Sequence, residues 1–526
     1  MADVPPQRAV TVVTTPGRPR PKPGPRVTSE PLIGVSPETL ERYHARILDP
    51  TTASRLAGQP TLRSTVYIGD RLLVTGDVDR EALDKAAATF DLRLEFEDPA
   101  LAMRSREVVK DIAVRVGLVP IGDQAVAAPD AFAVLQTYRG LVRRSNVAAQ
   151  TEVALDHLLL AGPYTHGSPY THGSPYTHGS PYTHGSGSDE YAYPGTGGRT
   201  PIAYVGAPPH RRPDDPSRRR PVVAVLDTGC GDHEWLQYPI VDREPTALSV
   251  PLSNPELTGV TLDVYEGLLD PDAGHGTFIA GLIRQVCPDA DILSIQIMGG
   301  DGVVPESDLL DVMNLLAERQ DRALAEGDPS QLIDVVSLSL GYYHELRDDS
   351  ATFEPMLAAP MRRLGELGVA IVVAAGNDAT DRPMYPAAFT PWSGGPNLAP
   401  DAGCVPVVSC GAQNPNGTTA LFSNAGHWVA TVEIGAGVMS TFPKFDGGES
   451  PDTETTLPDG TVRETIDPDD FTGGFGTWSG TSFAGPVLAG KIAQHLWCGD
   501  LTSTDGAEAL ARGWAAVTAC VPELHP

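Results

Sequence analysis

Short apolar runs alternate with amphipathic segments through the second half of the chain. The runs VVAVLDTG, ADILSIQIM, DVVSLSL, VAIVVAAG and VPVVSCGA are rich in Val and Ile and too short for helices. Between them, segments such as ESDLLDVMNLLAERQ and EPMLAAPMRRLGELG repeat apolar residues at helical spacing. Short apolar strands joined by helices are typical of a parallel sheet that is buried on both faces. The pattern therefore predicts an α/β domain with a mostly parallel central sheet over residues 221–526.

A smaller unit of different character precedes this domain. Residues 64–161 read as strand, helix, strand, strand, helix and strand, beginning with STVYIGDRLLVTG and ending with ALDHLLLAG. This order predicts a small ferredoxin-like α+β domain. Residues 1–63 begin with a stretch rich in Pro, Arg and Thr that lacks periodicity. We therefore expect a disordered N-terminal arm with one short helix around Pro37–Arg46.

Residues 162–220 predict a linker between the two units. The sequence PYTHGS occurs four times between Pro163 and Ser186, and Pro and Gly in every repeat prevent regular helix or sheet. Metal capture by the repeat histidines is an alternative, but their spacing on a flexible chain fixes no coordination geometry. We therefore favour a plain spacer. The histidines concerned are His166, His172, His178 and His184.

The charge balance excludes some classes of partner. The chain has 526 residues, with 38 Lys plus Arg against 67 Asp plus Glu, and a formal net charge of −29. Nucleic acid is excluded as the main partner, because binding phosphates needs a positive field. No apolar run approaches the roughly 18 residues of a membrane-spanning helix, so we expect no membrane span.

The start of the chain and its cysteines favour the cytoplasm. MADVPPQRAVTVVTTPGRPR has no apolar core behind a basic tip, as a signal peptide would. Six cysteines are too few for a disulfide scaffold and fit free thiols in a reducing compartment. Secretion by another route and a Cys498–Cys520 pair are the alternatives.

Two polar side chains stand where strands and helices of the predicted sheet meet. Asp227 ends the strand PVVAVLDTG, at the carboxyl edge where reactive groups of such sheets collect, and there it can orient an imidazole. His275 stands at the entry to a helix, between two glycines that leave its ring accessible. Taken alone, Asp227 also fits a turn cap and His275 a structural role.

Two further residues complete a catalytic pattern. Ser482, in WSGTSFAGP, stands at a helix N-terminus, where free backbone donors and the helix dipole stabilise an oxyanion. Pro486 is expected in the first turn of that helix. Asn377, in VAIVVAAGND, ends a buried strand and can direct an amide donor at the same oxygen. The alternatives are a serine cap and an asparagine that turns the chain.

Together these strings resemble the subtilase, or subtilisin-like, family of serine proteases. VVAVLDTG, GHGTFIAG, SLSLG, VVAAGN and SGTSFAGP occur in the order Asp, His, Ser, over about half of the chain. The resemblance implies a subtilisin-like three-layer domain and a serine endopeptidase that forms an acyl-enzyme. It gives Ser482 the role of nucleophile, His275 that of base and Asp227 that of orienting the base. Asn377 contributes to the oxyanion hole.

The resemblance also implies how substrate is bound. Segments equivalent to Ser339, Leu340, Gly341 and Gly302 pair with an extended peptide as neighbouring strands. The segment equivalent to Ala374, Ala375 and Gly376 lines one wall of the pocket for the residue before the scissile bond. The floor of that pocket lies in DATDRPMYPAAF, which departs from the family pattern, so cleavage preference stays undefined.

The N-terminal half and an acidic insertion leave several interpretations open. Many subtilases carry a propeptide of ferredoxin-like shape, so residues 64–161 are interpreted as an intramolecular inhibitor and folding chaperone, with an accessory domain as the alternative. The linker would supply the cleavage site, for which Arg218–Arg220 is a candidate. The insertion at about 444–471 fits a solvated loop, with a lid, a calcium loop or an acidic rim as alternatives.

No cofactor or metal is expected, and the expected partner is a peptide or protein substrate. Two other functions remain open. A subtilase can mature peptides by transamidation or leader removal, and nothing in the triad distinguishes this from hydrolysis. A catalytically inactive peptide-binding module is less favoured, because binding alone does not require all four site residues.

Overall fold

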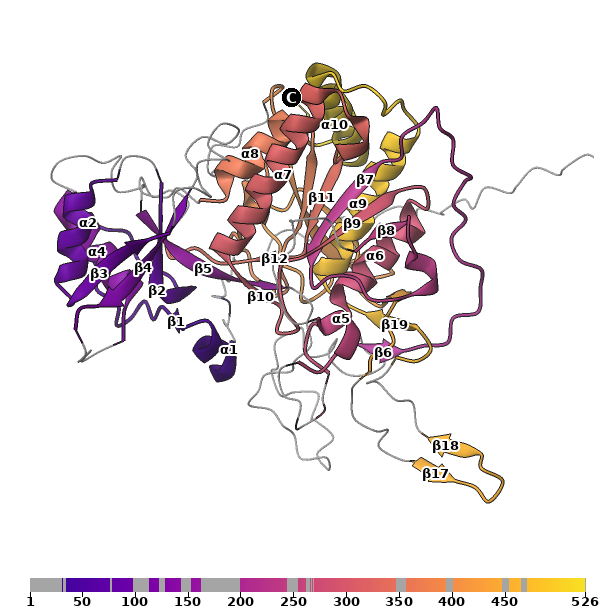
Figure 1. Cartoon of the computed structure of the whole chain (residues 1–526), viewed down its shortest axis with the longest axis horizontal. Coiled ribbons are helices and arrows are strands. Elements are labelled where there is room, and N and C mark those ends of the chain that lie inside the picture. Colours follow the sequence, from indigo (N-terminus) through magenta and orange to yellow (C-terminus); the bar gives the residue numbers. More distant parts are fainter. Residues whose placement is uncertain are drawn as a thin grey trace, which may run out of the picture.

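The computed structural model shows two units joined by one long strand (Figure 1). It describes residues 31, 35–75, 78–97, 113–122, 128–142, 153–161, 199–243, 254–261, 265, 267, 269–346, 356–393, 401–446, 454–464 and 471–525. The PYTHGS repeat, most of the predicted N-terminal arm and parts of the acidic insertion lie outside these residues. The short helix predicted near residue 37 is present as α1 (Pro37–Arg42), with Ser36 as its cap.

A seven-stranded sheet forms the centre of the larger unit. Its strand order is β15-β14-β13-β11-β7-β9-β8, and all neighbouring strands pair in parallel. The predicted parallel sheet is therefore confirmed. Its strands are β7 (Val222–Asp227), β8 (Val241–Asp242), β9 (Asp291–Gln296), β11 (Val335–Leu338), β13 (Ala370–Ala374), β14 (Val407–Gln413) and β15 (Thr431–Ile434).

Helices cover both faces of this sheet (Figure 1). Alternate residues of β7 show the division: Val223 and Val225 belong to one buried cluster, and Ala224 and Leu226 to the other. The first cluster is completed by α6 (His275–Val286), α9 (Thr481–Trp497) and α10 (Gly506–Cys520). The second is completed by α7 (Glu306–Glu326) and α8 (Ala358–Glu366).

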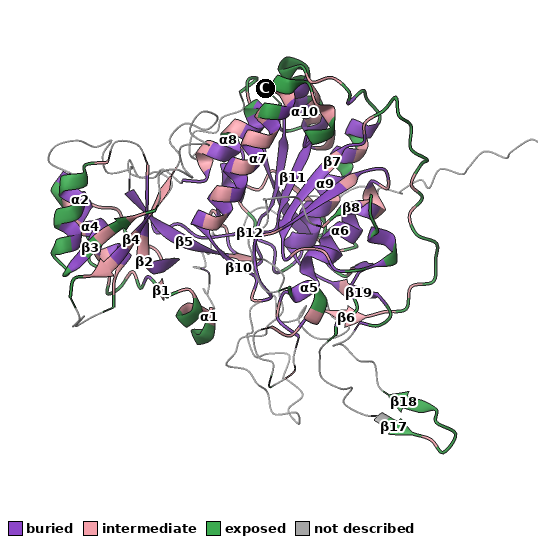
Figure 2. Ribbon diagram, viewed as in Figure 1, coloured by how far each residue is buried: buried purple, intermediate pink, exposed green. Residues whose placement is uncertain are grey.

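Smaller elements surround the sheet. β16 (Val438–Thr441), β19 (Phe475–Trp478) and β6 (Thr200–Pro201) form an antiparallel sheet, and α5 (Pro255–Thr258) lies near the start of α6. Within the acidic insertion, β17 (Glu454–Thr456) and β18 (Val462–Glu464) form an exposed hairpin that stands away from the core in Figure 2. The hairpin is solvated, as the charges of the insertion favour, whereas Phe445 and Phe471 at the two ends of the insertion are buried in the core.

The N-terminal unit has its own sheet and core. β2 (Val66–Val74), α2 (Arg80–Ala88), β3 (Leu92–Phe96), β4 (Val114–Pro120), α4 (Ala131–Val142) and β5 (Val153–Ala161) follow the predicted order of elements. The strands pair antiparallel in the spatial order β5-β2-β4-β3, with β1 (Ala45–Ile47) also paired to β2. The two helices pack on the sheet through a separate apolar cluster that includes Leu83, Leu135 and Tyr138.

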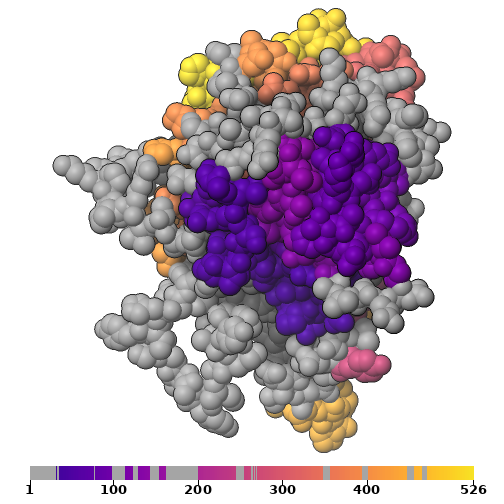
Figure 3. All heavy atoms as spheres, turned by 90° about the vertical axis from the view of Figure 1, so that its left-hand side faces the viewer, coloured from indigo at the N-terminus to yellow at the C-terminus, as the bar shows by residue number. Residues whose placement is uncertain are grey.

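Strand β5 extends beyond its own unit into the larger one. Its last residues pair antiparallel with β10 (Val303–Pro305) on one side and with β12 (Leu340–Gly341) on the other. The unit itself lies across one side of the molecule, as Figure 3 shows in indigo. Sequence patterns predict a self-contained domain here but cannot predict this pairing, which joins residues far apart in the chain.

The described part of the linker is bound to the larger unit. Arg199 donates to the carbonyl oxygens of Asp270 and Ala273, and β6 follows it directly. Arg219 makes a two-pronged ion pair with Asp334 at 2.6 and 2.7 Å, and its side chain is only 10% exposed. Because this arginine is held in place, the run at 218–220 is poorly suited as a cleavage site.

Two expectations from composition can be compared with the described residues. No helix among them is long and apolar enough to cross a membrane. All six cysteines are described and all are free thiols, so the alternative Cys498–Cys520 pair does not form.

Candidate active site

Asp227 and His275 meet at the carboxyl edge of the parallel sheet. Asp227 is the last residue of β7, and His275 is the first residue of α6. The His275 Nδ1 atom lies 2.7 Å from Asp227 Oδ1, and both side chains are buried. Because the carboxylate accepts, Nδ1 carries the hydrogen, which leaves Nε2 as the atom that can take a proton.

The environment of His275 sets its basicity. Burial alone lowers the pKa of the imidazole, but the charge and hydrogen bond of Asp227 outweigh it, and the pKa is raised. A raised pKa makes the ring a stronger base, although the ring must be neutral to act. Base catalysis by His275 is therefore expected to appear as the pH rises through this raised value.

Gly276 lets the helix with His275 approach strand β7. A Cβ atom on Gly276 would stand 2.0 Å from the carbonyl oxygen of Gly229, which is backbone and cannot swing away. The Gly276 N–H in turn donates to Thr228 Oγ1 at 2.9 Å. Glycine at this position therefore holds the imidazole against the Asp227 carboxylate.

Replacing Gly276 by alanine is expected to destabilise the fold by about 1–3 kcal/mol and to move His275 away from Asp227. Urea unfolding of the Gly276→Ala chain in a Ser482→Ala background, which prevents self-digestion, measures the first effect. Gly506→Ala is the matched control, because nothing lies within 4 Å of its added methyl group. Equal unfolding midpoints for the two variants would contradict the predicted steric conflict.

Ser482 is the second residue of α9 and is fully buried. Pro486 is the sixth helical residue, not in the first turn as the sequence suggested. Proline has no N–H, so the carbonyl of Ser482, four residues earlier, keeps no helical partner. Ser339 Oγ donates to that carbonyl at 3.0 Å instead. The predicted substrate-binding residue Ser339 thus also anchors the backbone at Ser482.

Thr481 fixes the orientation of Asn377. The Thr481 N–H and hydroxyl both donate to Asn377 Oδ1 at 2.9 Å, and the hydroxyl accepts from the Gly376 N–H at 3.0 Å. With its oxygen engaged in this way, Asn377 directs its Nδ2 donor elsewhere. The sequence motif contains Thr481, but nothing in the pattern alone shows that it orients Asn377.

Four polar atoms of the four candidate residues are buried without a hydrogen-bond partner among the described residues. They are Ser482 Oγ, His275 Nε2, Asn377 Nδ2 and the second carboxylate oxygen of Asp227, Oδ2. Unpaired buried polar atoms are costly, and they cluster where a protein binds or transforms a ligand. Asp227 and His275 are brought into direct contact, and Asn377 is linked to Ser482 through Thr481. The phenyl ring of Phe483, next to Ser482, lies 5.4 Å from the imidazole.

The predicted peptide groove contains the end of β5. Ala161 N–H donates to the Gly302 carbonyl at 2.7 Å. On the other wall, Leu340 pairs with Ala161 and Gly341 with Leu160. Both segments predicted to pair with substrate therefore hold residues of the chain itself, in the strand pairing that an extended peptide would make.

The predicted pocket wall at Ala374, Ala375 and Gly376 is buried at the end of β13. The Ala375 carbonyl accepts from Asn424 Nδ2 at 2.8 Å, and the Gly376 carbonyl accepts from the Asn424 N–H at 2.9 Å. Asn424 therefore fixes this wall, a role with no signal in the sequence. That the wall lines a substrate pocket stays a prediction.

A buried carboxylate binds the backbone segments that carry Asp227 and His275 through two threonine hydroxyls. Glu256, in α5, accepts hydrogen bonds from the hydroxyls of Thr228 and Thr277, which follow Asp227 and His275 in the chain. Burial raises the pKa of Glu256 to about 7. The two threonines belong to the motifs LDTG and HGT, but Glu256 lies outside any motif and was missed.

One group of described side chains could share a metal ion. His157, His344 and Glu345 place one ligand atom each within 4.8 Å of one another, and all three are buried. They lie between the two units and not at Ser482. Glu345 forms ion pairs with both histidines, and His157 forms a further one with Glu306, so the ion pairs explain this arrangement without a metal.

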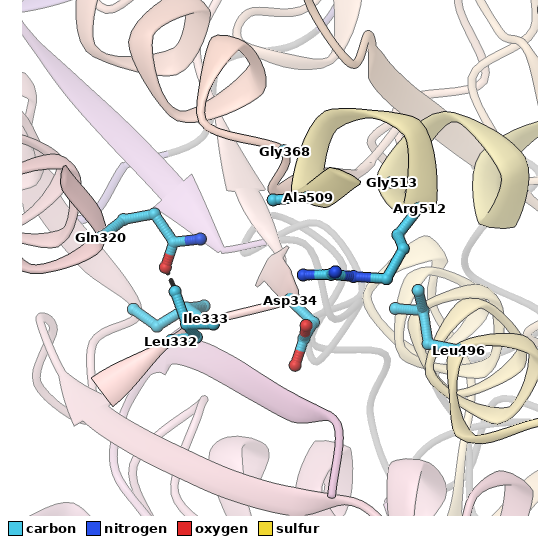
Figure 4. Close-up of a pocket in the computed structure, with 9 residues that line it drawn as sticks. All are labelled: Gln320, Leu332, Ile333, Asp334, Gly368, Leu496, Ala509, Arg512 and Gly513. Carbon is cyan, nitrogen blue, oxygen red and sulfur yellow. Dashed lines mark hydrogen bonds between the residues drawn. The ribbon is translucent and has the colours of Figure 1, made fainter. Parts of the chain in front are cut away.

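A small surface hollow lies at the opposite edge of the sheet (Figure 4). Asp334 on its wall precedes β11, whereas the candidate site lies at the carboxyl ends of the strands. Its polar groups are engaged: Gln320 Oε1 accepts from the Ile333 N–H at 2.8 Å, and Arg219 holds Asp334. The hollow therefore offers no reactive group, and the groove beside Ser482 is filled by β5.

Known proteins with similar sequences are proteases. An intracellular serine protease of Paenibacillus polymyxa is 27% identical over 287 residues, which cover 52% of this chain and 65% of that protein. An extracellular basic protease of Dichelobacter nodosus is 27% identical over 299 residues, which cover 52% and 42%. The chain thus spans less than two thirds of the length of either relative.

A solved structure and a family model complete the comparison. Fervidolysin from Fervidobacterium pennivorans, a keratinolytic enzyme related to subtilisin, aligns with a TM-score of 0.41 at 17% identity, over 82% of this chain and 55% of that one. The model of the subtilase family matches residues 218–497. Because that match spans all four candidate site residues and more than half of the chain, the chain belongs to the subtilase family.

Proposed function

We propose that this chain is a serine endopeptidase that is made as a self-processing precursor. Ser482 Oγ attacks the peptide carbonyl, and His275 Nε2 takes the hydroxyl proton and later gives it to the leaving amine. Asp227 holds the imidazole in the required tautomer. The acyl-enzyme on Ser482 is then hydrolysed by water. Asn377 Nδ2 and the Ser482 N–H receive the oxyanion.

One observation carries this proposal above the others. Ser482 Oγ, His275 Nε2 and Asn377 Nδ2 are the three atoms that must act on substrate. Each is buried and unpaired among the described residues, while Asp227 holds the imidazole and Thr481 holds the amide. A binding module would gain nothing from leaving these three atoms unsatisfied, because each costs desolvation energy. A catalyst needs them free for the reacting groups.

We propose that the N-terminal unit inhibits this site. Residues 158–161 of β5 lie between β10 and β12, where a substrate strand would bind. β5 runs antiparallel to β12, so its C-terminal end points towards Ser339, whose hydroxyl contacts the Ser482 carbonyl. The chain thus lies in the groove as an extended substrate would, with its C-terminal end directed towards the proposed nucleophile. A ferredoxin-like propeptide that also assists folding is the proposed role.

This direction also revises the proposed processing site. The chain leaves β5 at Ala161 towards Ser482, and the next described residue is Arg199. The proposed cut therefore lies within residues 162–198, and not at Arg218–Arg220, where Arg219 is bound to Asp334.

A fluorophosphonate probe tests the catalytic proposal directly. Once the wild-type chain has lost its N-terminal fragment, the probe is expected to label Ser482. The Ser482→Ala chain, which keeps this fragment, is expected to take no label. N-terminal sequencing of the processed protein is expected to begin within residues 163–199. An unlabelled Ser482 in separated, folded protein would exclude a nucleophile and favour the binding module. Transamidated products in mass spectra would favour peptide maturation instead.

The cytoplasm is the proposed location. The six free thiols support a reducing compartment. The two relatives described above differ, one being intracellular and the other extracellular. Fractionation of producing cells tests the proposal, and recovery of the protein from the medium of intact cells would contradict it.

A further inference from the structure

A buried cluster of charged side chains joins the two units directly beside the groove. Its centre is His157 of β5, one residue before the segment that lies between β10 and β12. His157 Nδ1 lies 2.7 Å from Glu306 Oε2, and His157 Nε2 lies 3.1 Å from Glu345 Oε2. All three side chains are at most 2% exposed.

The two carboxylates come from the two walls of the groove. Glu306 follows β10 directly as the first residue of α7, and Glu345 lies four residues beyond the end of β12. Carboxylate oxygens only accept hydrogen bonds, so a ring that bonds to both must donate from both nitrogens. His157 is therefore an imidazolium, and its two N–H groups hold both walls at once.

The surrounding charges balance only while His157 carries its proton. Arg139 of α4 lies 3.6 Å from Glu345, so two cations face two anions. His344 also lies beside Glu345, but burial lowers its pKa to about 3 and it stays neutral. Removal of the His157 proton leaves a net negative charge in a buried place and one ring nitrogen facing an oxygen without a hydrogen between them.

Two tyrosines near His157 do not change charge near neutral pH, and a third neighbour, Asp156, is bound by groups that favour its charged form. Tyr342 stacks on the imidazole with ring centres 4.3 Å apart and donates to Glu306, and burial raises its pKa well above the ordinary value. Tyr67, opposite His157 on β2, also has its pKa raised by burial. Asp156 is held by the Ser307 N–H and by Arg71 at 3.0 Å. Of these groups, His157 is the one that can respond to moderate alkali.

We propose that protonated His157 is a latch that holds the inhibitory strand in the groove, and that alkaline pH opens it. This inference rests on the proposed function only in calling the groove a substrate site, because closure itself requires no catalysis. The backbone pairing of β5 with β10 and β12 provides a contact that does not depend on pH. Alkali therefore weakens the closed state without abolishing it.

The sign of the pH effect follows from the two states of the ring. In the closed protein, burial lowers the pKa of His157, but the two glutamates outweigh it and raise the pKa to about 9. In the open protein both glutamates remain on the other unit, so the pKa returns to about 6.5. The stabilisation by protonated His157 is complete below the pKa of the open protein. It is lost as the pH rises through the pKa of the closed protein. The closed state is expected to weaken roughly a hundredfold over this interval.

Hydrogen exchange of the full chain measures this weakening. A Ser482→Ala chain, which cannot process itself, is followed between pH 6.5 and 10, and each rate is compared with the intrinsic rate at the same pH. Protection of the amides at 158–161 is expected to fall roughly a hundredfold. Protection in the central strand β7 is expected to stay unchanged. Constant protection at 158–161 would overturn the proposal.

Variants distinguish His157 from other titrating groups. His157→Gln keeps a polar side chain without a titration, so its protection is expected to be low already at pH 6.5 and flat with pH. His44→Gln is the matched control in the same unit, because that histidine is exposed and paired only with Asp70. Glu306→Gln should weaken the pH effect if His157→Gln fails to fold. A wild-type pH profile in Glu306→Gln would contradict the latch.

A chelator shows whether a proton or a metal ion links His157 to the carboxylates. Protection at pH 6.5 is expected to be unaffected by EDTA or by added Zn²⁺. A loss of protection with EDTA would show that a metal bridges His157, His344 and Glu345, and the proton latch would be wrong. None of these measurements depends on activity, so the latch and the protease proposal can fail separately.

Discussion

Replacing Ser482 by alanine is expected to slow conversion of the full chain into two fragments roughly 10⁶-fold, which makes it undetectable over days. The magnitude is that known for subtilisin, a member of the same family. The reason is that alanine removes the hydroxyl oxygen that His275 is proposed to activate. Gel electrophoresis of the purified chain over time measures the loss. His275→Ala is expected to cost about as much, and the double variant no more, because the residues act as one unit.

Ser479→Ala is a matched control for this substitution. Ser479 is also buried and lies three residues before Ser482, and its hydroxyl oxygen accepts a hydrogen bond from the Gly437 N–H at 2.8 Å. The Ser479→Ala chain is expected to process itself at a rate within about tenfold of the wild-type rate. If Ser482→Ala were cut at the wild-type rate in a purified sample, a different nucleophile or a contaminating protease would be responsible, and self-processing would be refuted.

Replacing Asn377 by alanine is expected to lower kcat roughly 10²–10³-fold with little change in KM. This magnitude also comes from subtilisin. The Asn377 Nδ2 donor is unpaired among the described residues, and in the proposed mechanism it meets an oxygen that becomes negative only in the transition state. Enough activity should remain for self-processing, so the separated enzyme can be assayed with a fluorogenic peptide.

Two further variants test whether the loss of kcat comes from the missing amide donor and not from a disturbed fold. Asn416→Ala, on the exposed surface, is expected to leave kcat unchanged. Thr481→Val removes the hydroxyl that orients Asn377 and should give an intermediate loss of kcat. A rise in KM with constant kcat for Asn377→Ala would mean that the amide binds substrate and transition state equally, contrary to the assigned role.

The sequence allowed much of the fold and the site to be predicted, because the signals are local. Apolar strands such as VVAVLD predict a parallel sheet, and strand ends bring Asp227 and Asn377 to one edge. Glycines around His275 mark a close approach that the Gly229 carbonyl explains. The motif around Ser482 predicts a nucleophile at a helix N-terminus, and the structure places Ser482 as the second residue of α9, although Pro486 lies one turn deeper in this helix than expected.

Contacts between segments that lie far apart in the chain could not be predicted from the sequence. Glu256 joins two threonines of different motifs, but it lies in a stretch with no pattern of its own. The pairing of β5 with β10 and β12 depends on which backbone groups the folded groove leaves open. His157 looks like one histidine in an apolar strand, and only the fold places Glu306 and Glu345 at its two nitrogens.

The two ends of the segment 162–198 have a consequence for how inhibition ends. Ala161 is bonded to Gly302, and Arg199 lies over the Trp478 ring, which packs against His275. If the N-terminal unit inhibits the site as proposed, the uncut chain between these two ends keeps it at an effective concentration on the order of millimolar, however dilute the protein is. A single cut removes this advantage. Escape of the fragment then depends on dilution, so a crowded compartment would keep the cut enzyme silent and a dilute one would release it.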